Sequence, residues 1–391
     1  MADDRDLGTG GAALALRRRG LLRAAAAAGL GLAAAPATLR HGRASSGEVS
    51  VFAWGDYADT FAKGGLKAKF EAASGIKLNL ATFGSNEELQ NKLKAAGGKG
   101  FDVIFPSVDT GPIFYADELL APIDESRVAV AQIIPAMWRS SLRLGAAHRG
   151  RRYLIPFDWG TEAITWNATR HPELEYGAIS YGDLFRPGAR AAVRQKSVLV
   201  SLALHLDATG EVKSDRGMDL VKSEADCRRV LEATTRHAIA HKAAIGAFWN
   251  NATEATAAFT DAGCTIGQTW DTTGILLNRT KGADWRYTMP VEGGLAWMDT
   301  CAIPAGAANV EQAYAFINFM LTPEAGAIFS NMTGYNTAAV GAEPFLSEES
   351  RAAFAMAYPD QAAIDNLWWW PMQTDFFARL RGEFVEKLTN A

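Results

Sequence analysis

The residues best suited to chemistry in this chain are tryptophans and aspartates that stand close together in the sequence. The clearest case is the stretch Gly293–Thr300, which contains Trp297 and Asp299 two positions apart. In a strand, both of these side chains point to the same face. A π-face beside a carboxylate suits an organic cation, because the ring attracts the charge and the carboxylate pairs with it. The alternative is an apolar strand with Trp297 in the core and Asp299 at a solvated end.

The same residue types follow other predicted strands. Ligands of open α/β sheets bind at the carboxyl ends of the strands, so we expect these side chains to surround one site. Two alternatives stay open: Asp109 could cap the helix that follows it, and Tyr57 could pack against the next helix. The candidate binding residues at these strand ends are Trp54, Asp56, Tyr57, Ser107, Asp109, Trp270 and Asp271.

The elements that position these residues alternate between strands and helices. Alternating β-formers and a 3.6-residue apolar period predict strands at 48–54, 76–83 and 101–106, with helices at 60–73 and 85–95 between them. This order predicts a doubly wound α/β lobe. At 391 residues the chain is long enough for two domains. Further predicted elements are strands at 151–156, 163–167 and 264–269 and a C-terminal helix at 375–387.

Composition and motifs exclude several function classes. The net charge of −4 gives no reason to expect a nucleic-acid or anionic-membrane surface. The chain has no H-E-x-x-H or G-x-S-x-G motif and no paired-cysteine metal signature, so we expect no catalytic residues, no metal site and no cofactor. His237 and His241 share a helix face that we expect to be solvated. Cys227, Cys264 and Cys301 are expected to be buried thiols, with one disulfide left open.

The N-terminus has the pattern of an export signal. Arginines at 17–19 precede an alanine-rich run at 24–35, and small residues at 35–37 resemble a cleavage site. The run is too short to span a membrane. Paired arginines followed by Gly-Leu-Leu suggest the twin-arginine route. We therefore expect a periplasmic protein whose mature chain starts between Thr38 and Glu48.

Four motifs occur in order with consistent gaps. They are Phe-Ala-Trp-Gly-Asp-Tyr at 52–57, Phe-Asp-Val-Ile-Phe-Pro-Ser at 101–107, Gly-Gly-Leu-Ala-Trp-Met-Asp-Thr at 293–300 with Ala-Ile-Pro after it, and Gly-Tyr-Asn-Thr at 334–337. With these motifs the chain resembles the periplasmic spermidine/putrescine-binding proteins of ABC importers, a branch of the bacterial solute-binding proteins. The resemblance covers nearly all of residues 49–390.

The resemblance implies a fold and a function. The fold is the two-lobed periplasmic binding protein fold, in which each lobe is a sheet flanked by helices and several strands cross at the hinge. The expected division is a signal and start at 1–47, a first lobe of 49–156 plus 299–335, and a second lobe of 157–298 plus 336–391. The implied function is to bind a polyamine between the lobes, as a monomer, and to deliver it to a membrane permease.

The resemblance also assigns ligand contacts residue by residue. It implies roles for Trp54, Asp56, Tyr57, Ser107, Trp270, Trp297, Asp299 and Tyr335. Asp109 and Asp271 are carboxylates beyond the usual set, and the register of the segment 368–373, which should hold a glutamine contact, stays open.

The second lobe departs from the pattern. Where the family has acidic contacts, gap counting places Arg194 and Ser197. If Arg194 faces the ligand, an ω-amino acid such as 4-aminobutyrate fits, with its carboxylate on this guanidinium. If it faces solvent, Asp109, Asp158 or Asp271 supplies the second acid for a polyamine. A metal-binding relative of the same fold and an enzyme are the remaining alternatives.

Overall fold

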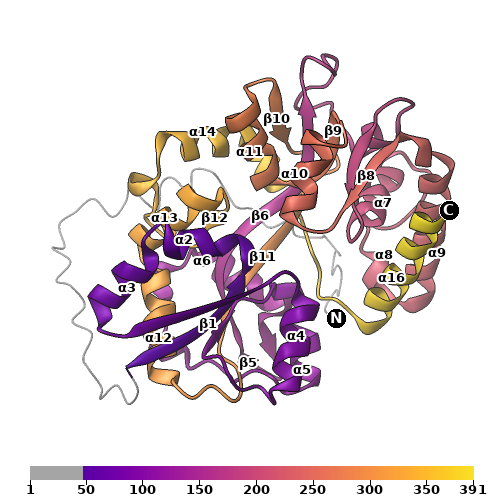
Figure 1. Ribbon diagram of the computed structural model, residues 1–391. Coiled ribbons are helices and arrows are strands. Elements are labelled where there is room, and N and C mark those ends of the chain that lie inside the picture. Colours follow the sequence, from indigo (N-terminus) through magenta and orange to yellow (C-terminus); the bar gives the residue numbers. More distant parts are fainter. Residues whose placement is uncertain (1–46) are drawn as a thin grey trace, which may run out of the picture.

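The structure is a computed structural model that describes residues 47–391. The predicted export signal and most of its cleavage region lie outside the described residues. One eleven-stranded sheet runs through the molecule and carries helices at both ends (Figure 1). Its main strands, in spatial order, are β2 (Lys77–Phe83), β1 (Glu48–Trp54), β3 (Val103–Ile104), β11 (Leu295–Ala302), β6 (Leu154–Asn167), β9 (Ile266–Trp270), β7 (Ala191–Arg194) and β8 (Ile245–Trp249).

The first half of the molecule follows the predicted β-α-β-α-β order. Strand β1 pairs in parallel with β2 and β3, and the side chain of Ser85 caps the second helix by accepting from the Glu88 N–H. The helix expected at 60–73 is broken, because Gly64 and Gly65 interrupt it and Gly65 takes a left-handed φ of 74°. The strand expected at 101–106 keeps only two residues of regular pairing. The helices are α2 (Ala58–Ala62), α3 (Leu66–Ser74), α4 (Asn86–Ala95), α5 (Gly111–Ala116) and α6 (Pro135–Ser141).

The two strands expected at 151–156 and 163–167 form one continuous strand instead. Strand β6 is 14 residues long and all but its last residue are buried. It pairs antiparallel with β11 from Leu154 to Glu162, and the register shifts between Asp299 and Thr300. Gly160 within this strand gives room to a neighbour, because a Cβ at this position would overlap the Trp297 ring.

Strands β6 and β11 connect the two ends of the molecule (Figure 1). Short strands extend the sheet beside them: β10 (Trp285–Thr288) and β12 (Asn336–Thr337) pair with β6, and β13 (Trp368–Trp369) pairs with β11. A separate pair is formed by β4 (Ala147–His148) and β5 (Arg151–Arg152). The lobe boundaries given above stay a prediction.

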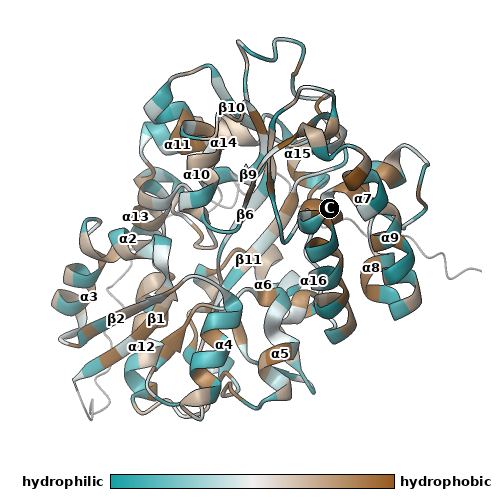
Figure 2. Cartoon of the chain, turned by 45° about the vertical axis from the view of Figure 1, so that its right-hand side comes forward, coloured by the Kyte–Doolittle hydropathy of each residue, from teal (hydrophilic) through white to brown (hydrophobic). Residues whose placement is uncertain are grey.

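The other end of the sheet has its own core. Helix α16 (Asp375–Asn390) buries Phe377, Leu380, Phe384 and Leu388 at helical spacing against α9 (Glu224–Ala240). Figure 2 shows that both helices also carry hydrophilic residues. The remaining helices here are α7 (Val198–Ala208), α8 (Asp219–Lys222), α10 (Ala252–Thr260) and α11 (Asp271–Lys281).

The chain returns to the first core before it ends. Helices α12 (Val310–Met320), α13 (Pro323–Thr333), α14 (Glu348–Ala357) and α15 (Gln361–Asp365) follow β11. Among residues 47–391, no helix combines the length and the apolar character of a membrane span. The three cysteines are buried and free, as expected.

Candidate functional site

A small cavity of about 60 Å³ lies where residues from both ends of the sheet meet. Ten of the eleven predicted contacts line it, and Asp271 does not. Four further lining residues were not among the predictions: Asn86, Glu162, Lys196 and Trp370. The full lining is Trp54, Asp56, Tyr57, Asn86, Ser107, Asp109, Glu162, Arg194, Lys196, Trp270, Trp297, Asp299, Tyr335 and Trp370. That these side chains bind a ligand stays a prediction.

Three carboxylates gather at one end of this cavity, of which Asp158 and Asp299 are buried and Asp56 is exposed. Asp299 accepts hydrogen bonds from the Ser107 hydroxyl at 2.6 Å and from the Tyr57 hydroxyl at 3.1 Å. Tyr57 lies in the 3₁₀ turn that follows β1, and its hydroxyl also lies 3.0 Å from both carboxylate oxygens of Asp158. Asp56 accepts from the Tyr335 hydroxyl at 2.7 Å. Hydroxyl groups therefore hold all three carboxylates.

No ion pair within residues 47–391 involves Asp56, Asp158 or Asp299. Burial raises the pKa of Asp299 to about 7, although its hydrogen bonds act in the opposite direction. Burial, and then the charge of Asp299, raises the pKa of Asp158 well above its usual range. Desolvation by the surrounding residues also raises the pKa of Asp56, although this residue is still exposed to solvent. A cation at this end would stabilise the ionised forms of all three.

Aromatic rings form much of the remaining wall. Trp54, Trp270, Trp297 and Trp370 all line the cavity. Trp297 meets the Tyr335 ring edge-on, with ring centroids 4.8 Å apart and an interplanar angle of 89°. Trp297 and Asp299 both reach the cavity, as their two-residue spacing on one strand requires. Indole faces next to carboxylates make an environment that favours an organic ammonium group.

The other end of the cavity contains Arg194, at the last residue of β7. The segment 194–197 has no carboxylate, as the sequence shows, but β6 supplies one here, Glu162, which was not among the predicted contacts. Arg194 Nη1 forms an ion pair with Glu162 Oε1, and the guanidinium carbon lies 4.5 Å from the centroid of the Trp270 ring. Glu162 is fully buried and also accepts from the Ser197 hydroxyl. The guanidinium is thus already bound to a carboxylate of the same chain.

The C-terminal segment has a defined register in the structure. Trp370 lines the cavity, and the Gln373 side-chain amide donates to the carboxylate of Asp109. Asp109 lies inside the 3₁₀ turn Val108–Thr110, so it does not cap a helix. Asn86, the first residue of α4, bonds to Ser107 through both its amide nitrogen and its oxygen. The helix was expected to start at residue 85, whose side chain is its cap, and this start could have located Asn86.

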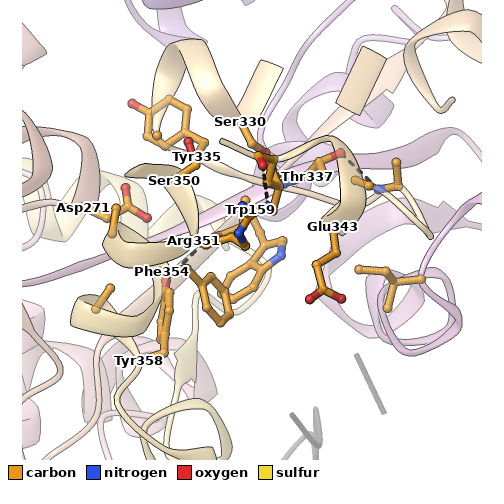
Figure 3. Close-up of a pocket in the computed structure, with 18 of the residues that line it drawn as sticks. Trp159, Asp271, Ser330, Tyr335, Thr337, Glu343, Ser350, Arg351, Phe354 and Tyr358 are labelled. Atoms are coloured by element: carbon orange, nitrogen blue, oxygen red, sulfur yellow. Dashed lines mark hydrogen bonds between the residues drawn. The ribbon is translucent and has the colours of Figure 1, made fainter. Parts of the chain in front are cut away.

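Asp271, the first residue of α11, does not line the small cavity but lies close to it, since a Cβ at Gly160 would meet both its Oδ2 and the Trp297 ring. Its carboxylate accepts from the backbone N–H groups of Thr161 and Thr272, and burial raises its pKa to about 8. It lines a second cavity of about 390 Å³, shown in Figure 3, whose walls are mostly apolar and include Trp159, Phe354 and Tyr358. Because neighbouring residues of a strand face opposite ways, Trp159 of β6 lines this second cavity while Asp158 is turned toward the Tyr57 hydroxyl. The carboxylate-rich small cavity is the better candidate for a charged solute.

Comparison with known proteins agrees with this architecture. The family model described as bacterial extracellular solute-binding protein matches residues 65–357. The chain belongs to this family. The match confirms the resemblance read from the four motifs, and it places the chain among proteins that bind solutes. In the described residues, no group of histidine, cysteine and acidic side chains is arranged to hold a metal ion.

Individual relatives share most of the chain's length. A spermidine/putrescine-binding periplasmic protein of Escherichia coli is 27% identical over 89% of this chain and 92% of its own length. A putrescine-binding periplasmic protein of the same organism is 28% identical over 77% of this chain and 80% of its own. The solved spermidine/putrescine ABC transporter substrate-binding protein of Streptococcus pneumoniae superposes with a TM-score of 0.69 at 24% identity, covering 88% of this chain and 98% of that one. These matches confirm the two-lobed fold.

Proposed function

We propose that this chain is the periplasmic solute-binding component of an ABC importer and that it binds a polyamine such as putrescine or spermidine. The observation that carries the proposal is the group of carboxylates beside tryptophan faces, two of them buried, which form no ion pair with a cation of residues 47–391. A primary ammonium group placed there gains an ion pair with Asp299 and cation–π attraction from Trp297. The names of the relatives support the same ligand class.

The proposal assigns the binding role to the residues that line the small cavity. One ammonium group binds at Asp299, with Asp56 and the Tyr57 hydroxyl close by. Asp109 lines the cavity and supplies an acid for a second ammonium group. The protein acts as a monomer after export and hands its ligand to a membrane permease. The remaining proposed contacts are Trp54, Ser107, Trp270, Trp297 and Tyr335.

A second candidate ligand is an ω-amino acid such as 4-aminobutyrate. The observation in its favour is that Arg194 and Lys196 both line the far end of the cavity. The observation against it is the ion pair between Arg194 and Glu162, which already occupies part of the guanidinium. For this ligand, the carboxylate would bind the N–H groups of Arg194 that do not pair with Glu162. The ammonium group would still bind Asp299.

Isothermal titration calorimetry on ligand-free protein tests both candidates. We expect putrescine or spermidine to bind with micromolar or lower Kd and 4-aminobutyrate to show no heat. Binding of the amino acid alone would favour the second candidate. If none of the three compounds binds, the polyamine proposal is wrong.

A further inference from the structure

We infer that Arg194 determines which amines the cavity accepts, because its guanidinium occupies the position where a further cationic group of the ligand would bind. This inference rests on the proposed function and narrows it to a substrate class. The protein should prefer a short diamine, with two ammonium groups, to a triamine, with three. Glu162 and Trp270 then form a second ammonium site that the chain fills with its own side chain.

The contacts of Arg194 are those of a bound cation. Its guanidinium carbon lies 4.5 Å from the Trp270 centroid and 5.4 Å from the Trp249 centroid, within the range of cation–π attraction. Its Nη1 pairs with Glu162. Arg194, Glu162 and Trp270 all line the small cavity. A carboxylate and an indole ring thus hold this guanidinium as Asp299 and Trp297 are proposed to hold the ammonium group of the ligand.

Glu162 is held in place independently of Arg194. Its Oε2 accepts from the Ser197 hydroxyl and, at 3.3 Å, from the side-chain amide of Gln268. Gln268 also donates to the Ser197 hydroxyl at 3.1 Å and accepts from the Ser201 hydroxyl at 2.9 Å. This network of buried side chains fixes the carboxylate on β6. Removing Arg194 would leave it ordered, buried and without its cation, which is a strong site for an ammonium group.

A second positive charge, that of Lys196, adds to the repulsion that Arg194 exerts on a cationic ligand. Lys196 lies two residues further on, lines the same cavity, and has its Nζ 5.9 Å from the centroid of the Trp370 ring. A triamine that fills the Asp299 and Asp109 positions would bring its third ammonium group to the Arg194 end of the cavity. Like charges in a partly desolvated cavity repel strongly. A diamine on Asp299 and Asp109 does not reach Arg194, although it does meet Lys196, whose charge interacts with Asp109.

The test replaces Arg194 with methionine, which keeps an unbranched side chain as far as the position of Nε and removes the charged guanidinium. For the wild-type protein we expect calorimetry to give a Kd for putrescine at least tenfold lower than for spermidine. For Arg194→Met we expect the Kd of spermidine to fall at least tenfold and the preference to disappear or reverse. Arg194→Lys keeps the charge and should keep the wild-type preference. Arg236→Met, at an exposed position of α9, is the matched control and should change neither Kd.

A double variant shows whether Glu162 is the group that receives the third ammonium. Glu162→Gln combined with Arg194→Met should lose most of the gain in spermidine affinity, and it leaves no unpaired charge that could prevent folding. The inference is overturned if Arg194→Met leaves the spermidine-to-putrescine ratio within threefold of wild type. It is also overturned if wild-type protein binds spermidine as tightly as putrescine, a result that needs no variant. If wild-type protein binds neither amine, the proposed function is wrong. In that case the inference about Arg194 stands only if the Arg194→Met variant binds spermidine.

Discussion

The hydroxyl of Tyr57 lies 3.1 Å from Oδ2 of Asp299 and at the same time 3.0 Å from both oxygens of Asp158. A hydroxyl group has one proton to donate, so it cannot serve both carboxylates at once. All three side chains are buried. Without a ligand, a proton on one of the carboxyl groups relieves the repulsion, in agreement with the raised pKa values of Asp158 and Asp299. An ammonium ligand relieves it more effectively.

The first prediction concerns Tyr57→Phe. The ring packs edge-on against Phe105 and Phe329, so the variant should fold. The lost hydrogen bond to a charged group is worth about 1.5–3 kcal/mol, so putrescine affinity should fall roughly 10- to 150-fold. Calorimetry measures the change. Tyr176→Phe is the control. It removes an exposed hydrogen bond from a tyrosine hydroxyl to the carboxylate of Asp360 and should have no effect on binding. Unchanged affinity in Tyr57→Phe would show that the Tyr57 hydroxyl does not contribute to binding.

The second prediction concerns Asp299→Asn. Removing one partner of a buried, hydrogen-bonded charge pair costs about 2–5 kcal/mol. Polyamine affinity should therefore fall by roughly 30-fold to several thousand-fold. Asp261→Asn, at an exposed position after α10, serves as the control. A loss of less than threefold in Asp299→Asn would show that this carboxylate does not anchor the ligand.

The third prediction concerns Trp297→Leu, which keeps an apolar side chain and removes the π-face. The loss should be smaller than for Asp299→Asn, because cation–π attraction contributes about 0.5–2 kcal/mol. We expect an affinity loss of roughly 2- to 30-fold, with some further loss from the removed packing against Tyr335. Trp285→Leu removes a tryptophan of β10 that packs against Phe259 instead, and its binding should match wild type. A larger loss than for Asp299→Asn would reverse the proposed ranking of the two contacts.

The fourth prediction is a pH dependence of folding stability. The carboxyls of Asp299 and Asp271 have pKa values raised from 3.8 to about 7 and about 8 by burial. Between pH 4 and pH 8 these two carboxyls therefore bind more protons in the folded protein than in the unfolded chain, and their contribution to stability falls as the pH rises. These groups should give ligand-free protein a higher Tm at pH 5 than at pH 8. Saturating putrescine should reduce the difference, since an ammonium group lowers the pKa of Asp299. A ligand-free Tm that rises steadily from pH 5 to pH 8 would contradict this assignment.

The fifth prediction concerns closure of the two lobes. The cavity is lined from both ends of the sheet, for example by Ser107 after β3 and Trp270 at the end of β9, so a ligand that touches both sides favours a closed state. Small-angle X-ray scattering should show a smaller radius of gyration with saturating putrescine. The Asp299→Asn variant at the same ligand concentration is the control and should show a smaller change or none. Identical wild-type curves with and without ligand would argue against a hinge.

Much of the fold could be predicted because its signals are local. Strand β1, helices α4 and α16 and the caps at Ser85 and Ser223 follow from periodicity and from side chains that bond within a few residues. One error was local, the missed break of a helix at Gly64 and Gly65, and the larger one fell where distant residues decide. Strand β6 contains Asp158, Gly160 and Glu162, and the sequence therefore predicted two strands with a gap between them. Pairing with β11 and β9 on its two sides keeps the segment extended.

For the site, the sequence by itself determined which side chains could hold an ammonium group. The two-residue period of a strand places Trp297 and Asp299 on one face, and the strand-end rule gathered Trp54, Asp56 and Ser107. Only the tertiary structure decided how the charges pair. Glu162 and Arg194 are 32 residues apart, and Asp109 and Gln373 are 264 apart, so no local pattern connects either pair. Whether a buried charge is free for a ligand depends on its nearest partner in space, and the folded chain alone brings that partner within hydrogen-bonding distance.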